Sequence, residues 1–502
     1  MVKRSKIIYA LVLAGLLGFV LALCGCRGKP DTSATTHTSL RPQLELVCEK
    51  PLGNVAENRI PDVTKSGWSL GIPFTRPVVF PDGGWVLAVE EAQMTLLDTA
   101  SGKELWKKAT YGGIDNYVAT EDRLYLTEKG SYGKKKEHGY VICLDAKSGK
   151  ELWRYDIQRD LAPVVERHIL ADAKLSYCCY IKLALFGDKL VAKGYTGWKV
   201  GEKSDKAEVL LRLDRDGRRL WKVESHGYPG IAAHSRIELI GDRLVMGSYT
   251  YGDSTTGPTY IHAFDINTGE KLWQFDIEHE DELAYSDATD VAVAIVGDKV
   301  VGITNYGRIY VLDENGNKLN TFLAFEPVKR NGTVICTNVW GNKVAGYGND
   351  TLIIAPGKTV VKGAANYQAR APVQHPDAGS VKVYGLDGKL KWKFRLGGQA
   401  TVLSVKGDYM ILGTAHNQDT LDWSYCGVYA FNLAQEGAGE EVDVTKESAV
   451  EKYLGYYRTD GVIPYGCLDA SADNRTICAA TWPTRVGTEK HGRHSLYILK
   501  LK

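Results

Sequence analysis

The sequence predicts an all-β fold, an eight-bladed β-propeller of four-stranded antiparallel blades, on three observations. A tight turn followed by an apolar strand recurs eight times. A second signature, an apolar strand ending in Asp, a turn with Gly and a strand with Trp, alternates with the first. The 502 residues include 53 Gly, 28 Tyr and 11 Trp but only 4 Met. Such a composition is typical of many short strands joined by tight turns.

The first signature places two turn residues before a short apolar strand. Gly, Asp and Asn supply the positive φ angles or the side-chain caps that hairpin turns require. Lys189-Leu190-Val191 is one of the strands that follow such a turn. The eight turns are Asp82-Gly83, Glu121-Asp122, Gly187-Asp188, Gly241-Asp242, Gly297-Asp298, Gly341-Asn342, Gly407-Asp408 and Asp473-Asn474. Each turn is expected to join the first two strands of one blade.

The second signature supplies the last two strands of a blade. It ends in a tryptophan in five copies, at Trp106, Trp153, Trp221, Trp273 and Trp392. The fifth copy in chain order has Asn320 where Trp is expected, and the seventh has lost both its Gly and its Trp. The shortest repeat shows the minimal unit, with strands expected at 291–295, 299–304, 309–312 and 318–322. Four antiparallel strands per repeat are typical of a propeller blade.

The two ends of the chain predict how the ring closes. The last repeat offers three strands, near residues 463–467, 476–481 and 495–500, and no fourth. Residues 44–48 form a solitary strand before the first complete repeat. We expect this N-terminal strand to complete the eighth blade, because closure leaves no open sheet edge.

The second signature resembles the PQQ-binding-like repeat. Asp265-Ile266-Asn267-Thr268-Gly269-Glu270-Lys271-Leu272-Trp273 follows that repeat closely, and the resemblance covers roughly residues 70–500. Quinoprotein alcohol dehydrogenases and the BamB lipoproteins of outer-membrane barrel assembly share it. The resemblance implies that each Trp packs between neighbouring blades, where burying the ring contributes a few kcal/mol. It implies the fold more strongly than any activity.

The first 26 residues are expected to be a lipoprotein-type signal peptide. Lys3, Arg4 and Lys6 precede an apolar run from 7 to 23. Leu23-Cys24-Gly25-Cys26 then resembles a bacterial lipobox, with Cys26 as the lipidated residue. Two alternatives stay open: Cys24 as acceptor, with a bulky Leu before it, and an uncleaved anchor of about 17 apolar residues. Residues 27–43 are expected to be a flexible linker, and 44–502 one propeller domain outside the cytoplasm.

Two cysteine pairs are candidate sites. Cys178 and Cys179 could be the counterpart of the adjacent cysteines above the quinone in quinoprotein dehydrogenases. The alternative is that they point to opposite faces of one strand as structural residues. Cys467 and Cys478 flank the turn at Asp473-Asn474 and could form a disulfide, unless the hairpin register offsets them. Acidic residues between 278 and 290 could hold Ca²⁺ or form a solvated connection.

Charge and loop lengths limit the function further. The formal net charge is +2, so nucleic acid is not an expected partner. Long connections accumulate between the second and third strands of the blades, at 128–139, 195–207, 249–258, 349–379, 415–422 and 483–493. Because strands alternate in direction, these connections and the blade-to-blade connections share one face. Insertions confined to one face of a repeat protein usually mark its binding surface.

Three functions are compatible with these patterns. The first hypothesis is a lipid-anchored, non-enzymatic scaffold that binds an envelope protein or ligand on the elaborated face, without a cofactor. The second is a dehydrogenase that uses PQQ with Ca²⁺, in which Cys178 and Cys179 lie over the cofactor. The third is a protein that binds carbohydrate or another polymer through aromatic loops. No catalytic residue and no metal ligand can be assigned from the motifs.

Overall fold

The computed structural model divides the chain into two compact units, residues 1–40 and 41–502, and all that follows concerns the second. Within it the structure describes residues 43–63, 75–90, 93–109, 114–129, 139–169, 174–200, 203–227, 236–248, 259–277, 291–304, 307–337, 339, 343–357, 359–361, 375–417, 420–434, 441–443 and 454–502. The lipobox, the linker to residue 42, the acidic connection and several long loops lie outside these residues. No helix of the described residues is long and apolar enough to cross a membrane.

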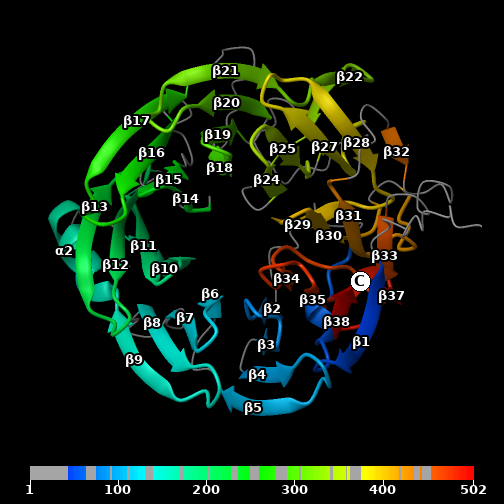
Figure 1. Cartoon of the computed structure of the whole chain (residues 1–502), viewed down its shortest axis with the longest axis horizontal. Coiled ribbons are helices and arrows are strands. Elements are labelled where there is room, and N and C mark those ends of the chain that lie inside the picture. The colour runs from blue at the N-terminus through cyan, green and yellow to red at the C-terminus, as the bar shows by residue number, and fades with distance from the viewer. Residues whose placement is uncertain are drawn as a thin grey trace, which may run out of the picture. The chain divides into compact units, whose positions relative to one another are not determined.

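The second unit is an eight-bladed β-propeller (Figure 1), which confirms the predicted fold class. Each blade of the first five is a four-stranded antiparallel sheet whose strands follow one another in sequence. Their bounds are β2 Arg76–Val79, β3 Trp85–Val89, β4 Gln93–Asp98 and β5 Glu104–Ala109 in blade one; β6 Ile114–Ala119, β7 Arg123–Lys129, β8 Gly139–Asp145 and β9 Glu151–Asp156 in blade two; β10 Lys174–Phe186, β11 Lys189–Val200, β12 Lys203–Leu213 and β13 Arg219–His226 in blade three; β14 Glu238–Ile240, β15 Arg243–Gly247, β16 Thr259–Asp265 and β17 Lys271–Ile277 in blade four; and β18 Val291–Val296, β19 Lys299–Thr304, β20 Arg308–Leu312 and β21 Lys318–Leu323 in blade five.

The last three blades contain insertions or a strand from the other end of the chain. Blade six has β24 Val344–Tyr347, β25 Thr351–Ile354, β27 Ser380–Gly385 and β28 Leu390–Arg395, with β32 Glu441–Asp443 added in parallel beside β28; blade seven has β29 Ala400–Lys406, β30 Tyr409–Thr414, β31 Gly427–Asn432 and β33 Leu454–Arg458; blade eight has β34 Leu468–Ala470, β35 Thr476–Ala480, β38 Ser495–Leu501 and β1 Leu44–Pro51.

The N-terminal strand closes the ring. β1 pairs antiparallel with β38, from Leu44 opposite Leu501 to Pro51 opposite Ser495. The register shifts once, between Leu46 and Cys48. The predicted closure of the last blade is therefore confirmed, and every blade has at least four strands.

Smaller elements lie between the strands of the blades. A three-stranded sheet joins β22 Val328–Arg330, β23 Thr333–Thr337 and β26 Thr359–Val361, and a hairpin joins β36 Thr484–Val486 to β37 Glu489–His491. Helix α2 Gln158–His168 connects blades two and three, and a short 3-10 helix, η1, spans Glu57–Arg59. The sequence patterns gave no sign of α2.

Three details of the expected repeat are wrong. The turn between the first two strands of blade six contains Gly348, with φ +58°, instead of Gly341-Asn342. The connection expected at 195–207 is mostly strand, because β11 and β12 continue as one long hairpin with Trp198 opposite Asp205. The first strand of blade eight begins at Leu468, after the expected segment 463–467.

The hydrophobic core consists of layers between neighbouring blades. Between blades three and four, for example, Val191 and Leu210 pack against Leu244, Met246 and Phe264. The opposite side chains of blade three, such as those of Val209 and Leu211, pack toward blade two. Both faces of each blade are thus buried, so β-strands such as β18 are apolar along their whole length instead of alternating.

Candidate functional site: the channel and the loop face

The repeat tryptophans join each blade to the next one by a hydrogen bond. The indole Nε1 of Trp106 donates to the carbonyl oxygen of Ala146 at 3.0 Å, and that of Trp153 to Arg215 at 2.8 Å. Trp221 donates to Ile266 at 2.9 Å and Trp273 to Glu314 at 3.0 Å. Each acceptor lies in the turn between the last two strands of the following blade. These contacts make the four tryptophans structural residues of the ring.

A glycine in the same turn lies under each of these indole rings. Gly269 has φ +77°, and a Cβ atom added there would lie 2.8 Å from Trp221. Blade five replaces Trp with two residues: Asn320 Nδ2 donates to the Leu386 carbonyl at 2.8 Å, and Phe322 packs against Gly388. The hydrogen bond and the ring contact are therefore both kept, although the expected residue is absent.

Replacing Gly269 with alanine should lower the free energy of unfolding by about 2–4 kcal/mol, because strain at positive φ adds to overlap with the indole. Gly187→Ala is the matched control, since Gly187 has φ +63° and nothing lies within 4 Å of an added Cβ. It should cost only about 1–2 kcal/mol. Urea unfolding of both variants measures the difference, and equal losses would contradict the role given to the indole contact.

Trp392 and Cys48 depart from this pattern. Trp392 stacks edge-on against Phe394 of its own strand, at 5.6 Å between ring centroids, and β32 lies along the outer side of that strand. In blade eight, Cys48 makes the corresponding contact with blade one. Its Sγ would lie 2.4 Å from a Cβ atom added at Gly102. A small side chain thus fills the place of an indole where the ring closes.

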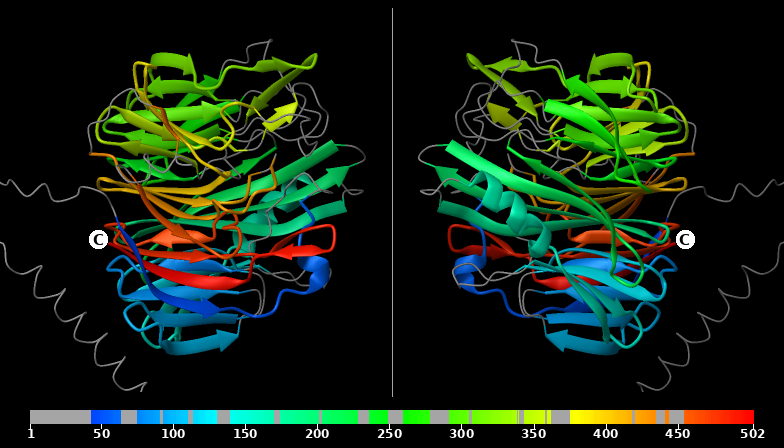
Figure 2. Two further views of the ribbon diagram at one scale, coloured as in Figure 1. Left: turned by 90° about the vertical axis from the view of Figure 1, so that its right-hand side faces the viewer. Right: turned by 90° about the vertical axis from the view of Figure 1, so that its left-hand side faces the viewer.

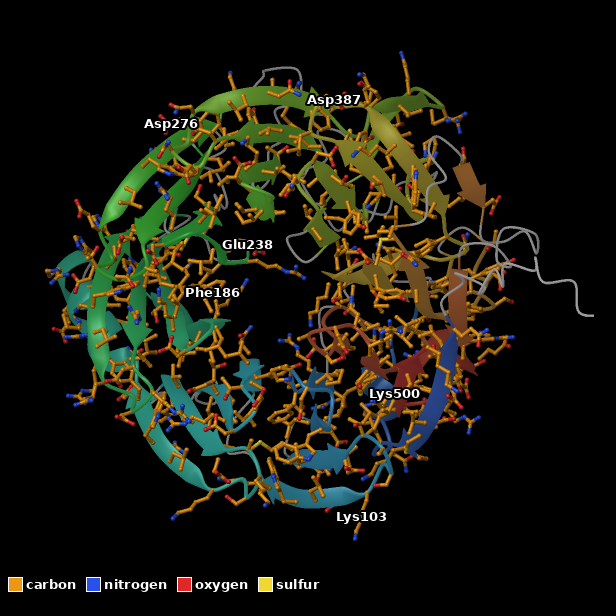
Figure 3. The ribbon with its side chains drawn as sticks, viewed as in Figure 1. Lys103, Phe186, Glu238, Asp276, Asp387 and Lys500 are labelled. Carbon is orange, nitrogen blue, oxygen red and sulfur yellow. The ribbon has the colours of Figure 1, made fainter. Side chains whose placement is uncertain are left out.

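A pocket of about 630 Å³ lies in the central channel. It is lined by residues at the ends of the innermost strands of five blades, mainly β2, β6 and β34. Figure 3 shows labelled residues of inner strands, Phe186 and Glu238, nearest the middle of the ring, whereas Lys103 and Asp387 lie at its rim. The pocket walls are mostly Pro, Val, Ala and Leu, with Tyr117, Lys406 and Asp469 as polar groups.

The polar groups of this pocket are held by backbone atoms. Asp469 accepts a hydrogen bond from the Val79 amide at 2.9 Å, and burial raises the pKa of its carboxyl group. Lys406 donates to the carbonyl oxygen of Ala470 at 2.6 Å. Arg236 crosses the channel, since its Nη2 reaches the Leu403 carbonyl three blades away at 3.4 Å. The channel is therefore lined by both signs of charge at this end.

At the other end of the channel, three consecutive blades bring polar groups together. Lys343 precedes β24, Gln399 precedes β29 and Tyr465 precedes β34. Lys343 Nζ and Gln399 Nε2 each lie 3.1 Å from the Tyr465 hydroxyl oxygen. Lys343 is fully buried, and burial lowers the pKa of its amine to about 7. Within the described ranges, no Asp or Glu carboxylate forms an ion pair with the Lys343 amine.

An aromatic stack ties the loops of blades seven and eight together on this face. Trp423 lies between two imidazole rings, 4.9 Å from His416 and 4.0 Å from His491, both nearly parallel to it. Its Nε1 also donates to Thr484 Oγ1 at 2.9 Å. The connection after β30 and the β36–β37 hairpin therefore form one ordered surface.

Most of the described insertions lie on one face of the ring. Figure 2 shows the long β10–β12 strands, the β36–β37 hairpin and β26 extending on the same side. These elements follow the second strand of a blade, or connect two blades, as the alternation of strand direction requires. The exception is β32, which lies in the long connection between β31 and β33. The β31–β33 connection departs from the predicted pattern, because it joins the third and fourth strands of blade seven and is nevertheless long.

The predicted cysteine sites have different outcomes. Cys178 and Cys179 lie in β10, where the pairing with β11 is interrupted between Tyr177 and Tyr180, and their side chains lie outside the described residues. The disulfide between Cys467 and Cys478 is not formed, because both thiols are free. The register sets Cys478 opposite Asp469, and the Cys467 carbonyl accepts a hydrogen bond from Ala480, so the two cysteines are offset along the hairpin.

The calcium-bound quinone of the second hypothesis requires several oxygen ligands at one point. Within the described ranges, no group of three or more His, Cys, Asp or Glu side chains converges to hold a metal ion. The carboxylate nearest the channel pocket, Asp469, is already bound to the Val79 amide.

These features define the class of protein: an eight-bladed propeller whose blades are joined by tryptophans and closed by the N-terminal strand. A family model described as outer membrane protein assembly factor BamB matches residues 61–171 and 118–313, which together span half of the chain. The chain therefore belongs to this family of PQQ-like repeat propellers. No curated protein matches the sequence.

Several solved structures are similar to this chain at low identity. BamB from Moraxella catarrhalis is 13% identical, with a TM-score of 0.46, over 91% of this chain and 99% of that chain. A europium-containing methanol dehydrogenase is 11% identical, with a TM-score of 0.49, over 91% and 93%. Sqt1 of Saccharomyces cerevisiae is 11% identical, with a TM-score of 0.49, over 86% and 97%. At these identities and TM-scores, the likenesses imply no substrate or partner for this chain.

Proposed function

We propose that this protein is an exported, lipid-anchored scaffold that binds another envelope protein on the face carrying the insertions. The observation that carries the proposal is the set of insertions on one face of the ring: the long β11–β12 hairpin, the β36–β37 hairpin and the extra sheet of β22, β23 and β26. The model of this family is described as outer membrane protein assembly factor BamB, and this description supports a role in the cell envelope. The signal-like segment ending in Cys26 supports export and anchoring.

The insertions provide the kind of surface that protein partners use. Trp423 is half-buried and stacks against His416 and His491. Because its ring is already held in place, binding a partner costs little side-chain entropy at this residue. Lys490 and Glu489 at the tip of the β36–β37 hairpin are exposed and add a polar rim. Rigid aromatic residues surrounded by polar ones are typical of binding surfaces.

Site-specific photocrosslinking in cells tests the proposal. A photoreactive residue at Lys490, on the loop face, should give one discrete adduct with an envelope protein. The same residue at Lys389, in the short turn between β27 and β28 on the opposite face, is the matched control and should give none. Equal labelling from the two faces, or no adduct from either, would contradict the proposed binding face.

A calorimetric titration with PQQ and Ca²⁺ separates the scaffold from the dehydrogenase. The scaffold predicts no saturable binding by the full-length chain. Saturable one-to-one binding that weakens on replacing Cys178 and Cys179 would replace the proposed function by the quinone enzyme. Palmitate labelling that is lost in Cys26→Ser, and kept in Cys24→Ser, tests the anchor separately.

A further inference from the structure

Blade six differs from the other blades by a fifth strand at its outer edge. β32 lies beside β28 at the rim of the ring (Figure 1) and pairs with it in parallel. The pairing has three residue pairs, from Lys393 opposite Glu441 to Arg395 opposite Asp443. Among the described residues, the fourth strand of every other blade ends its sheet without such a neighbour. The outer edge of β28 is therefore an edge that has already accepted an added strand.

β32 comes from an insertion in the neighbouring blade. The third and fourth strands of the first six blades are joined by short turns, such as 266–270 in blade four and 386–389 in blade six. In blade seven the same connection runs from 433 to 453 and contributes residues 441–443 to the edge of blade six. Blades six and seven each have four strands without it. The insertion thus covers an edge that the ring does not need to have covered.

The edge and the strand that covers it carry opposite charges. Arg395 donates to Glu441 Oε1 through Nε at 2.9 Å and through Nη2 at 2.7 Å. Lys393 Nζ lies 3.9 Å from the same oxygen. In sequence the covering strand is an acidic, an apolar and an acidic residue, Glu441-Val442-Asp443. The edge of β28 therefore suits an extended segment that carries a carboxylate beside Arg395.

The contacts that hold β32 on this edge are few. Three residue pairs supply only a few backbone hydrogen bonds, and the side chains of Arg395 and Glu441 are 43% and 47% exposed. Ion pairs this exposed are screened by water and salt and stabilise a fold little. Short elements with exposed hydrogen bonds open locally at a low free-energy cost. Once β32 leaves, the backbone groups of the β28 edge are available to another strand.

We propose that the outer edge of β28 is a second binding site, which takes an extended acidic segment of another protein by strand addition, and that β32 is an intramolecular strap competing for it. The site lies at the rim of the ring, apart from the insertions of the loop face, so it does not rest on the function proposed above. Because the strap is tethered beside the edge, it keeps the edge covered until a segment of higher affinity or local concentration displaces it.

Photocrosslinking with a peptide of this chain's own sequence tests the site. The probe is residues 439–446 with a photoreactive group at the position of Val442, added to the full-length chain at increasing concentration. In a variant without the strap, a Gly/Ser segment of equal length replaces residues 436–448. The adduct should map to β28, and the half-saturating concentration should fall about threefold to tenfold when the strap is removed. No adduct on β28, or an unchanged concentration dependence, would overturn the proposal.

Point substitutions assign the effect to the strap. Glu441→Arg in the otherwise intact chain places like charges beside Arg395 and should increase labelling in the same way. Glu270→Arg, in an exposed turn of blade four, is the matched control and should leave labelling unchanged. A dimer of the intact chain that disappears when the strap is removed would overturn the proposal, because the strand would then belong to a second copy.

Modified peptides separate strand addition from simple attraction between charges. N-methylation of the three residues 441–443 keeps both carboxylates and removes the N–H donors, so labelling of the variant without the strap should be lost. Arg395→Glu in that variant should abolish labelling, and a peptide carrying Glu441→Arg should restore it. Equal labelling by the methylated peptide, or labelling that Arg395→Glu leaves unchanged, would overturn the proposal.

Discussion

Replacing Trp221 with alanine should lower the free energy of unfolding by about 3–5 kcal/mol, the cost of removing a large buried aromatic side chain. Trp221 is 9% exposed, covers Gly269 of the next blade and donates to the Ile266 carbonyl. The variant loses the ring contact and leaves that carbonyl without its donor. Urea unfolding followed by circular dichroism measures the loss.

Two comparisons separate the contributions of the indole. Trp221→Phe keeps most of the ring and removes the N–H donor, so it should cost about 1–2 kcal/mol. Asn320→Ala removes the corresponding bond to Leu386 but leaves Phe322 on Gly388, so it should cost a similar amount. A loss in Trp221→Ala no larger than that in Asn320→Ala would contradict the view that ring burial dominates the contact between blades.

Replacing Lys343 with methionine should stabilise the protein by roughly 2–4 kcal/mol at about pH 6. The wild-type amine is buried without a carboxylate among the described residues, and its pKa in the folded chain is about 7 against an ordinary value of 10.5. Methionine fills a similar volume without a charge. It also removes one hydrogen bond to Tyr465, which keeps its bond with Gln399.

The contribution of Lys343 to the free energy of unfolding changes with pH in a definite direction. Between pH 7 and 10.5 the unfolded chain holds the proton and the folded chain does not, so wild-type stability rises with pH through this window, and below it the full cost remains. Lys343→Met should lack this part of the rise. Measurements should stop near pH 9, because burial raises the pKa of Cys467 to about 12 and stability then falls as the unfolded thiol ionises.

Urea midpoints at about pH 6 and about pH 9 for wild type, Lys343→Met and Lys103→Met measure this difference. Lys103 is exposed and lies at the rim of the ring (Figure 3), so its variant should follow the wild type at both pH values. If Lys343→Met proves less stable than wild type at pH 6, the amine stabilises the folded chain, and the inference that its buried charge is destabilising is wrong.

The repeat could be predicted from sequence because its signals are local. Gly297-Asp298 fixes a hairpin within a few residues of chain, and the strands of blade five agree with prediction to within one residue. The first turn of blade six was misplaced because Gly341-Asn342 has the composition of a true turn, and composition does not distinguish it from the turn at Gly348. The helix α2 has 11 residues and contains Pro163, a residue that disfavours a helix interior, so no helix was expected there.

The polar sites could not be predicted, because they depend on contacts between distant segments. Lys343 and Tyr465 are 122 residues apart in the sequence. They meet because the two inner strands that follow them begin at the same end of the channel. In sequence each is one polar residue beside an apolar strand. The offset of Cys467 from Cys478 likewise depends on where β34 begins.

The pairing of β1 with β38 also sets the order of events in folding. Paired residues such as Leu44 and Leu501 lie roughly 450 residues apart in the sequence. The entropic cost of closing this long loop is therefore incurred in one late step. Until β38 is synthesised, β1 has no partner and the last blade has an open edge that can recruit other chains. The ring therefore closes last, and a force applied to the N-terminal end of β1 acts directly on the pairing that closes it.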